Sequence, residues 1–343
     1  MVQRLWYYLL RTYVWIGLRF YFKKIIVHGR ENIPDGPLIF VANHQNSFMD
    51  ALMIVCHTPQ ITHFLARADV FKKRFLGWLL NTLNMVPIYR IRDGWQTLSE
   101  NQETFNRCGT IFLKNEAVVI FPEGNHGSER RLRPLSRGFV KIALESLKKY
   151  PDLKIDIVPV GLNYSDHNAF RGSVSVYFGE AIQVRDFFRE PLQSQSNRLR
   201  EEVVRRLQCM ITHIDAAHYS EIFRKLESTH PDYLDPFETN ERISKIENGE
   251  TISDTRATLK NKSLSLLHYP AQLLHFIPLF FWRKIKSKIK DPALLVSLDF
   301  VFGIFAFPLF YLLTAIVIYV LWGSIMAGCW LIICFISPLF LRK

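Results

Sequence analysis

Short apolar runs alternate with helix-like stretches through the first 190 residues of the chain. The apolar runs have the length and composition of buried strands, and they lie at 25–28, 37–42, 61–66, 85–89, 117–121, 155–161 and 173–178. Between them, residues 95–114 and 137–150 are amphipathic and long enough to be helices. This alternation predicts an α/β fold with a mostly parallel central sheet flanked by helices.

The strand pattern stops near residue 186. A helical apolar stripe follows, formed by Leu199, Val203, Leu207, Met210, Ile211 and Ile214. Residues 216–262 are polar and charged, and we expect a small helical insert or a surface segment there. Residues 266–282 are apolar and aromatic but contain Pro270 and Pro278, so we expect this segment to lie along a membrane surface.

The last part of the chain has the composition of a membrane anchor. Residues 300–341 contain no charged side chain. Because about 20 apolar residues cross the hydrocarbon core of a bilayer, this length predicts two spans, at 300–319 and 324–341, joined at 322–324 as a transmembrane helical hairpin. One long tilted helix, or a hairpin that enters the bilayer without crossing it, is the alternative.

A second membrane contact is predicted at residues 1–22. This segment is rich in aromatic and aliphatic side chains, yet Arg4, Arg11 and Arg19 fall on one side of the helix that it would form. A narrow cationic stripe on an apolar helix favours an amphipathic helix that lies in the membrane interface. The alternative is an ordinary first helix that packs on the core with its arginines in water.

Composition and charge agree with a membrane-associated protein. The chain has 343 residues, of which 49% are hydrophobic, and a formal net charge of +12. That charge suggests a polyanionic partner, and the apolar tail favours anionic membrane lipids over nucleic acid. Cations flank the tail on both sides, at Arg283, Lys284, Lys286, Lys288 and Lys290 before it and at Arg342 and Lys343 after it. An integral membrane protein whose main domain faces the cytoplasm is therefore predicted.

These patterns divide the chain into four parts. They are an interfacial helix (1–22), an α/β domain (23–190), a helical extension with a basic, membrane-skimming segment (191–292) and a transmembrane hairpin (293–343). Five scattered cysteines, Cys56, Cys108, Cys209, Cys329 and Cys334, are expected to be free thiols in a reducing compartment.

Candidate chemistry begins directly after the second predicted strand, in the segment Asn43-His44-Gln45-Asn46-Ser47-Phe48-Met49-Asp50. A neutral imidazole held by a nearby carboxylate is a general base at neutral pH. His44 and Asp50 are therefore candidates for a catalytic pair. The alternative is a strand-to-helix turn in which Ser47 caps the next helix and Asp50 lies in its first turn.

A second candidate segment, Phe121-Pro122-Glu123-Gly124, ends another apolar run and precedes a cluster of cations, at Arg130, Arg131, Arg133 and Arg137. His44, Arg90 and Glu123 each come just after a predicted strand. Ligands of α/β sheets gather at the carboxyl ends of the strands. This common placement supports a single site formed by the three residues.

Four segments, in this order, make the chain resemble the phospholipid/glycerol acyltransferase superfamily across residues 20–190. They are Asn43-His44 with Asp50, Val86-Pro87-Ile88-Tyr89-Arg90, Phe121-Pro122-Glu123-Gly124 and Ile157-Val158-Pro159-Val160. In that family an Asn-His-x4-Asp block supplies the base, an arginine-bearing block and a Phe-Pro-Glu-Gly block bind the acceptor, and a Val-Pro-Val block closes the site. The resemblance implies the family's glycerol-phosphate acyltransferase-like fold.

Two departures from the family pattern concern the site itself. Five residues rather than four separate His44 from Asp50, so the pair needs a different turn, or Asp50 is only a helix cap. The family's Glu-Gly-Thr-Arg is Glu123-Gly124-Asn125-His126 here, so its phosphate-binding arginine is missing. Arg137, Arg131 or His126 is a candidate replacement. A further alternative is that Arg130, Arg131 and Arg133 only hold lipid head groups.

The resemblance implies His44 as the base, Asp50 as its partner and Arg90 as the first phosphate contact. Glu123 would accept from glycerol hydroxyls or hold a basic residue, while Gly124 would let the backbone approach the ligand and donate its amide to an oxyanion. No serine nucleophile elbow is present, so direct transfer is expected.

The expected function is that of a membrane-bound O-acyltransferase. It would move a fatty acyl group from acyl-CoA or acyl carrier protein to 1-acylglycerol 3-phosphate, with no metal or other cofactor. Glycerol 3-phosphate or dihydroxyacetone phosphate is an alternative acceptor, because residues 276–292 resemble the same segment of yeast-type glycerol-3-phosphate acyltransferases. A catalytically inactive membrane-remodelling protein is the alternative from another class.

Overall fold

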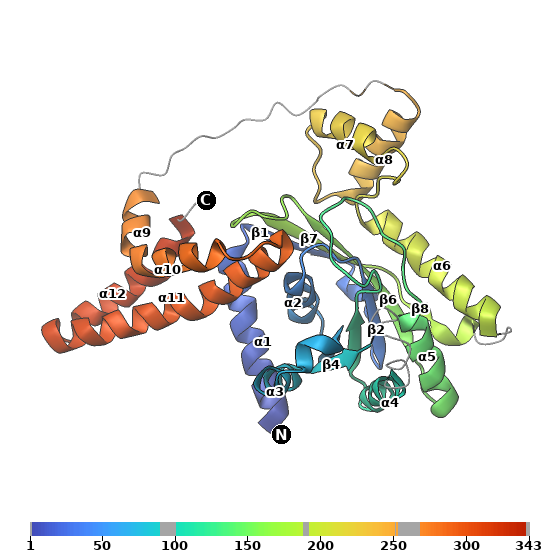
Figure 1. The fold of residues 1–343 in the computed structure, drawn as a ribbon, viewed down its shortest axis with the longest axis horizontal. Helices are drawn as coiled ribbons and strands as arrows, with labels where there is room; N and C mark the ends of the chain where they lie inside the picture. The colour runs from blue at the N-terminus through green and yellow to red at the C-terminus, as the bar shows by residue number, and fades with distance from the viewer. Residues whose placement is uncertain (1, 90–100, 188–191, 251, 253–267, 341–343) are drawn as a thin grey trace.

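A mixed β-sheet lies at the centre of the computed structural model, which describes residues 2–89, 101–187, 192–250, 252 and 268–340 (Figure 1). Within these residues the sheet has eight strands, β1 (Lys24–His28), β2 (Leu38–Ala42), β3 (Thr62–Arg67), β4 (Met85–Ile88), β5 (Ala117–Ile120), β6 (Asp156–Tyr164), β7 (Ser173–Phe178) and β8 (Ile182–Gln183).

The strand order is β1-β7-β6-β2-β5-β3-β4, with β8 paired to β6. Every neighbouring pair is parallel except β6–β7 and β6–β8. The seven predicted strands and the α/β class are confirmed, and the sheet is mixed through β6, β7 and β8. Because β2 and β5 are parallel neighbours, the segments that follow them leave the same edge of the sheet.

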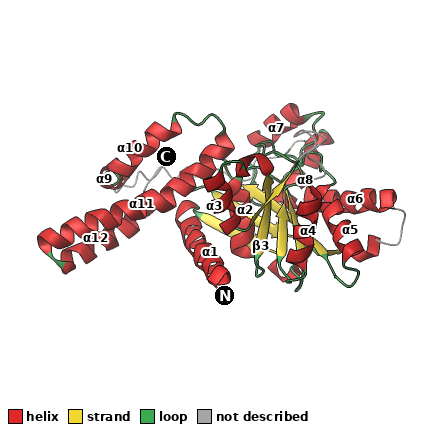
Figure 2. Cartoon of the chain, turned by 60° about the horizontal axis from the view of Figure 1, so that its bottom comes forward, coloured by secondary structure: helices red, strands yellow, loops and turns green. Residues whose placement is uncertain are grey.

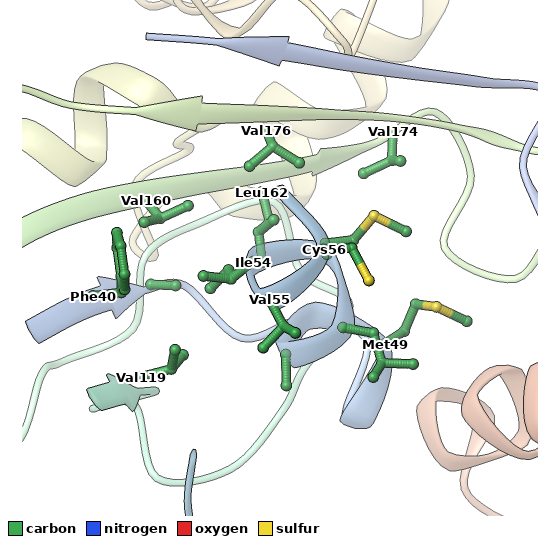
Figure 3. Packing of buried hydrophobic residues seen from close by; sticks show 14 of the residues in the cluster. Phe40, Met49, Ile54, Val55, Cys56, Val119, Val160, Leu162, Val174 and Val176 are labelled. Atoms are coloured by element: carbon green, nitrogen blue, oxygen red, sulfur yellow. The ribbon is translucent and has the colours of Figure 1, made fainter. Parts of the chain in front are cut away.

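Alternation of side chains along β2 assigns the two faces of the sheet. Leu38, Phe40 and Ala42 belong to one core cluster, Ile39 and Val41 to the other, and all five are fully buried. The first face packs on α1 (Val2–Tyr21) and α2 (Phe48–His57), as Figure 3 shows for the α2 side chains above β2. The second is covered by α4 (Asn101–Phe112), α5 (Gly138–Lys149) and α6 (Leu192–Met210) (Figure 2).

Further helices extend this framework. α3 (Arg74–Thr82) lies between β3 and β4 in the chain. Residues 199–211 of the predicted apolar stripe pack α6 against the sheet, whereas Ile214, the last member of the stripe, belongs to the core of the next unit. Beyond it, α7 (Tyr219–Ser228) and α8 (Pro236–Glu247) form a small unit with its own core around Ile222, Leu226 and Ile243, so the insert is helical where it is described.

Four C-terminal helices lie beside the sheet domain: α9 (His268–Leu274), α10 (Phe276–Lys286), α11 (Pro292–Trp322) and α12 (Ser324–Ile336). Pro270 and Pro278 fall in the first turns of α9 and α10, where a missing N–H costs no hydrogen bond. The chain reverses at Gly323, which has φ 84°, and α11 and α12 lie side by side (Figure 1). A 3₁₀ turn, Ser337–Phe340, follows.

In the part of the chain that the structure describes, α11 alone is long and apolar enough to cross a membrane. Its 31 residues span about 46 Å at a rise of 1.5 Å each. The 13 residues of α12 span only about 20 Å, less than the roughly 30 Å of a hydrocarbon core. The predicted pair of spans at 300–319 and 324–341 is therefore not seen, because a helix of 31 residues and one of 13 residues take their place.

One arginine of α1 is used inside the protein. The Arg11 guanidinium donates to the carbonyl of Thr58, so the alternative that leaves these cations in solvent is wrong for Arg11. The side chain of Arg4 lies 3.8 Å from the Glu116 carboxylate but is 66% exposed, as that alternative expects. Apolar side chains of α1 are exposed as well, with Leu5 61% and Leu9 58% exposed. A membrane-interfacial position for this apolar surface stays a prediction.

Candidate active site

A side-chain amide holds the start of the loop that follows β2. Asn43 Nδ2 donates to the carbonyl of Leu162 at 3.0 Å, and its Oδ1 accepts from the Leu162 amide at 2.8 Å. Asn43 is fully buried. Its side chain thereby extends the parallel pairing of β2 and β6 by one step and fixes the direction in which His44 leaves the sheet.

His44 and Asp50 are in direct contact. His44 Nδ1 lies 2.9 Å from Asp50 Oδ2, and Asp50 is fully buried in the first turn of α2. The same oxygen accepts from the amides of Gln45 at 2.8 Å and Asn46 at 2.7 Å, and Oδ1 accepts from the Tyr164 hydroxyl at 2.6 Å. Both carboxylate oxygens are thus satisfied inside the protein. Asp50 lies in the first turn of α2, and it also holds the loop and the imidazole.

The extra residue between His44 and Asp50 is accommodated at Ser47. Ser47 has φ 50° and ψ −128°, a backbone conformation that non-glycine residues rarely adopt. Its side chain makes no capping hydrogen bond, so the capping interpretation of Ser47 is wrong. Support comes instead from α11, because Ser297 Oγ donates to the Asn46 carbonyl at 3.1 Å and accepts from the Met49 amide at 3.3 Å.

The His44 ring is oriented for proton transfer. It stacks on Phe121 with ring centroids 4.2 Å apart, and its side chain is 16% exposed. Because Nδ1 faces a carboxylate, it carries the proton, which leaves the lone pair on Nε2. Among the described residues Nε2 has no hydrogen-bond partner. It is therefore free to accept a proton from a bound hydroxyl.

Glu123 connects the loop that follows β5 to the loop that follows β2. Its Oε1 accepts from the His44 amide at 3.2 Å, and its Oε2 pairs with Arg133. Burial raises the pKa of this carboxyl to about 7, against the opposite effect of Arg133. Of the two roles predicted for Glu123, the structure shows it holding a basic residue.

That basic residue, Arg133, is part of the site but was not predicted to be. Besides Glu123 it contacts Asn125 Oδ1 at 2.8 Å through Nη1 and the His44 carbonyl at 3.0 Å through Nη2. Arg130 is buried, donates to the Tyr164 carbonyl at 3.0 Å and lies over the Tyr233 ring. The alternative in which these arginines only hold lipid head groups is wrong for Arg130 and Arg133, because both are used inside the protein.

Gly124 has φ 78°, which explains glycine at this turn. Its amide donates to the Phe121 carbonyl at 3.2 Å. The turn thus uses this amide, and the suggestion that it serves an oxyanion stays a prediction.

A second histidine–aspartate pair lies next to the first. His126 Nε2 is 2.7 Å from Asp291 Oδ2, and the His126 ring centroid lies 5.8 Å from that of His44, edge-on. Asp291 is the N-cap of α11 and accepts from the amides of Ala293 and Leu294. Burial opposes its ionisation, but the His126 hydrogen bond helps to lower the pKa of Asp291 overall. A membrane-type helix thus orients a loop residue beside His44.

The remaining predicted contacts are less closely tied to the site. Arg131 Nε pairs with Glu129 at 2.6 Å. Arg137 is exposed at the start of α5, and its side chain has no partner in the part of the chain that the structure describes. Arg90 lies outside the described residues. Their roles in binding stay predictions.

The structure brings together His44, Asp50, Glu123, Gly124 and His126 from the predicted set. It adds three residues, Tyr164, Arg133 and Asp291. Tyr164 was missed because β6 runs three residues beyond the predicted end at 161, which places its last side chain against Asp50. An Asp-Pro step at 291–292 was the available sign of a helix start.

Comparison with known proteins matches residues 24–163 to the Acyltransferase family model. The chloroplastic 1-acyl-sn-glycerol-3-phosphate acyltransferase of Brassica napus is 28% identical over 152 residues, 43% of this chain and 40% of that protein. The enzyme of the same name from Bacillus subtilis is 24% identical over 193 residues, 55% of this chain and 89% of that protein.

Glycerol-3-phosphate O-acyltransferase 1 of Saccharomyces cerevisiae is 39% identical over 80 residues, 23% of this chain and 10% of that protein. The chain thus spans less than half the length of the Brassica and Saccharomyces relatives. Among solved structures, the 1-acyl-sn-glycerophosphate acyltransferase PlsC of Thermotoga maritima has a TM-score of 0.43 and 22% identity, covering 60% of this chain and 81% of that one.

Proposed function

We propose that the whole chain is an O-acyltransferase that converts 1-acylglycerol 3-phosphate to phosphatidate, because residues 24–163 match the Acyltransferase family model. The donor is a thioester, either acyl-CoA or acyl carrier protein. One observation carries the proposal: His44 is held by the buried Asp50 with Nε2 unoccupied at the carboxyl edge of the sheet. The names of the Brassica and Bacillus relatives support the choice of acceptor.

In the proposed reaction the acceptor hydroxyl gives its proton to His44 Nε2 as its oxygen bonds to the thioester carbonyl carbon. The carbon–sulfur bond then breaks, and the proton passes from the imidazolium to the departing thiolate. Asp50 stabilises the imidazolium and keeps Nδ1 protonated. Arg133 and Glu123 hold the main chain of His44, so they act on the geometry of the base.

The acceptor phosphate needs fixed cations. Arg90, which directly follows the β4 segment, remains the first candidate, and Arg137 and Arg131 follow it. The His126 ring lies beside that of His44, with centroids 5.8 Å apart, and its Nε2 lies 2.7 Å from the Asp291 carboxylate, so His126 is a further candidate. A phosphate bound there would lie beside the base.

Glycerol 3-phosphate is the second candidate acceptor. The 39% identity to the Saccharomyces glycerol-3-phosphate O-acyltransferase, although confined to 80 residues, favours it. A smaller acceptor brings the same hydroxyl and phosphate chemistry, so the same residues would serve.

We also propose a membrane setting in which α11 is inserted and the α/β domain faces the cytoplasm. Only 6% of the most apolar 18-residue window of α11 is buried inside the protein. This exposed apolar surface supports insertion. The cations of 283–290, next to the start of α11, support the orientation.

Purified full-length protein in detergent tests the function. Acyl-CoA is supplied with 1-acylglycerol 3-phosphate, glycerol 3-phosphate, dihydroxyacetone phosphate or no acceptor, while free thiol and product mass are measured. We expect thiol release that depends on 1-acylglycerol 3-phosphate, with phosphatidate as the product. Thiol release without acceptor would indicate a hydrolase, and no release with any acceptor would contradict the enzymatic proposal.

A further inference from the structure

An apolar cavity of about 560 Å³ lies between α1 and the C-terminal helices, apart from the candidate active site. This volume falls within the roughly 300–1,000 Å³ of small-molecule sites. Its walls are almost entirely aromatic and aliphatic, and include Phe20, Phe300, Phe307 and Phe335. Among the described residues that line it, neither His44 nor Asp50 appears.

The contact between α1 and α11 that forms one wall is specific. Pro308 has no N–H, so the carbonyl of Ile304 in the preceding turn loses its helical partner. The Tyr13 hydroxyl on α1 donates to that carbonyl. Close approach requires Gly17, where an added Cβ would lie 2.6 Å from the Ile304 side chain.

The other walls are fixed in the same way. Trp282 on α10 packs on Phe302 of α11 with centroids 5.0 Å apart, and Phe20 of α1 meets Phe335 of α12 at 4.8 Å. His275 Nε2 lies 2.8 Å from Ser337 Oγ and ties the start of α10 to the end of α12. The cavity is therefore bounded by interlocked helices and is not a chance gap between loosely placed ones.

In the described part of the chain, three charged side chains belong to the lining, Arg283, Lys286 and Asp299. Arg283 and Lys286, one turn apart on α10, are both exposed and belong to the wall. The carboxylate of Asp299, which also lines the cavity, accepts a hydrogen bond from the Tyr21 hydroxyl at 3.2 Å. An apolar chamber with two cations at its rim has the chemistry of a lipid whose head group carries a phosphate.

We propose that this cavity holds one acyl chain of a resident anionic phospholipid, with its phosphate paired to Arg283 and Lys286. This lipid differs from the reacting substrate, because the lining residues come from α1, the C-terminal helices and Phe170 and do not include the His44–Asp50 pair. Its chain fills the space between these helices and so fastens the C-terminal helices to the α/β domain. This inference does not depend on which acceptor the enzyme uses.

Mass analysis of lipid retained by purified full-length protein after detergent exchange tests the proposal. Gly303 lines the cavity and an added Cβ would meet nothing within 4 Å, so Gly303→Leu extends into open space. Gly328→Leu on α12 is its matched control, since Gly328 is equally free of contacts and lies outside the lining. We expect wild type and Gly328→Leu to retain about one phospholipid per chain and Gly303→Leu to lose most of it.

The head-group part is tested with the double variant Arg283→Gln, Lys286→Gln. Retention of phosphatidylglycerol added in micelles should fall on the order of 30-fold, because each of the two cations near a lipid phosphate contributes on the order of 1 kcal/mol. Lys288→Gln, in the same basic run but outside the lining, should retain it.

Equal retention by Gly303→Leu and Gly328→Leu would overturn the proposal, as would a wild-type protein that retains no lipid. Retained lipid that is consumed on addition of acyl-CoA would also overturn it, because the occupant would then be the acceptor. The His44→Ala variant should hold the same lipid as wild type, which separates this test from that of the catalytic proposal.

Discussion

At the scale of single residues, the site depends on one buried carboxylate that accepts four hydrogen bonds. Asp50 accepts hydrogen bonds from an imidazole, two amides and the Tyr164 hydroxyl. The two amides belong to the loop itself, so the position of the base and the shape of the loop depend on the same group. Tyr164 is the one partner that can be removed without altering the loop sequence.

Tyr164→Phe should therefore lower both stability and turnover. The ring is kept, but a buried carboxylate loses a donor, which costs about 1.5–3 kcal/mol of unfolding free energy. We expect kcat to fall severalfold because the Asp50 carboxylate is less firmly held. Thermal unfolding and initial rates measure the two effects.

Tyr177→Phe is the matched control for this change. The Tyr177 hydroxyl donates to the Leu234 carbonyl at 3.1 Å, away from the site. It should lose some stability and leave kcat unchanged. If both variants lose the same fraction of kcat, Tyr164 does not act through Asp50.

Glu123 contributes to stability by an amount that depends on pH. Burial raises the pKa of its carboxyl to about 7, so the folded chain binds this proton more tightly than the unfolded chain does. Its contribution to stability is full below the ordinary glutamate pKa of about 4.3 and is lost as the pH rises through about 7. Glu123→Gln removes the titration.

The unfolding temperature of wild type minus that of Glu123→Gln should therefore fall as the pH is raised from about 5 to about 8. Differential scanning calorimetry in detergent measures both proteins across this range. A difference that rises or stays constant with pH would contradict the raised pKa.

Residue roles were predictable where the motif is local. His44 and Asp50 are six positions apart, and their contact follows from one loop and one helix turn. The roles of Tyr164 and Arg133 depend on contacts with residues 114 and 89 positions away. No local pattern encodes such distances, and the cationic cluster that contains Arg133 is compatible with a surface patch as well as with a buried clamp.

At the scale of elements, α11 connects the apolar tail to the site. Asp291 at its N-cap orients His126, and Ser297 in its second turn supports the turn at Asn46 and Met49. The strained backbone at Ser47 thus lies against a helix that the sequence analysis assigned only to the membrane. The first two turns of α11 are part of the site's framework.

Asp291→Asn separates the capping role of this residue from its charge. Asparagine caps helices as well as aspartate does, so stability should change by about 0.5 kcal/mol or less. The His126 ring loses its charged partner, and we expect the KM for the phosphate acceptor to rise severalfold with a smaller change in kcat. Steady-state kinetics with varied acceptor measure both constants.

Asp235→Asn is the matched control, because Asp235 caps α8 through two amides and precedes a proline in the same way. It should leave KM unaltered. An unchanged KM in Asp291→Asn as well would mean that the orientation of His126 is unimportant for the acceptor.

Helices and strands were predictable where burial gives the sequence a regular pattern of apolar residues. The seven predicted strands are apolar runs between turn residues, and all are present. β8 has only two residues, Ile182–Gln183, too few for any period. The end of the tail was misread for a related reason: residues 300–341 are apolar throughout, so no change of polarity marks where α12 ends at Ile336. The sign of the start of α11, the Asp-Pro step at 291–292, lies before this apolar run.

At the scale of the whole molecule, the reactivity of the five free cysteines can show which parts of the chain a membrane covers. Cys209 is exposed on α6, and Cys329 is exposed on α12. Cys108 is buried in the domain core, where burial raises the pKa of its thiol to about 12. If α12 is in lipid, Cys329 is shielded by the bilayer even though the protein leaves it open.

A membrane-impermeant maleimide added to wild-type protein in lipid vesicles should label Cys209 on outward-facing molecules and leave Cys329 unlabelled. Cys108 should react only after denaturation, because the thiolate is the nucleophile. Peptide mass analysis identifies each site. Equal labelling of Cys209 and Cys329 in intact vesicles would contradict the membrane position of α12.

The proposed acyl transfer depends on the imidazole of His44 as its base. The most direct measurement compares the acceptor-dependent thiol release of His44→Ala with that of His28→Ala, an exposed histidine stacked on Tyr177 at the far edge of the sheet. We predict that His44→Ala loses on the order of 10² to 10⁴ in kcat while it unfolds at the wild-type temperature, and that His28→Ala keeps its rate. A folded His44→Ala protein that transfers acyl groups at the wild-type rate would contradict the account.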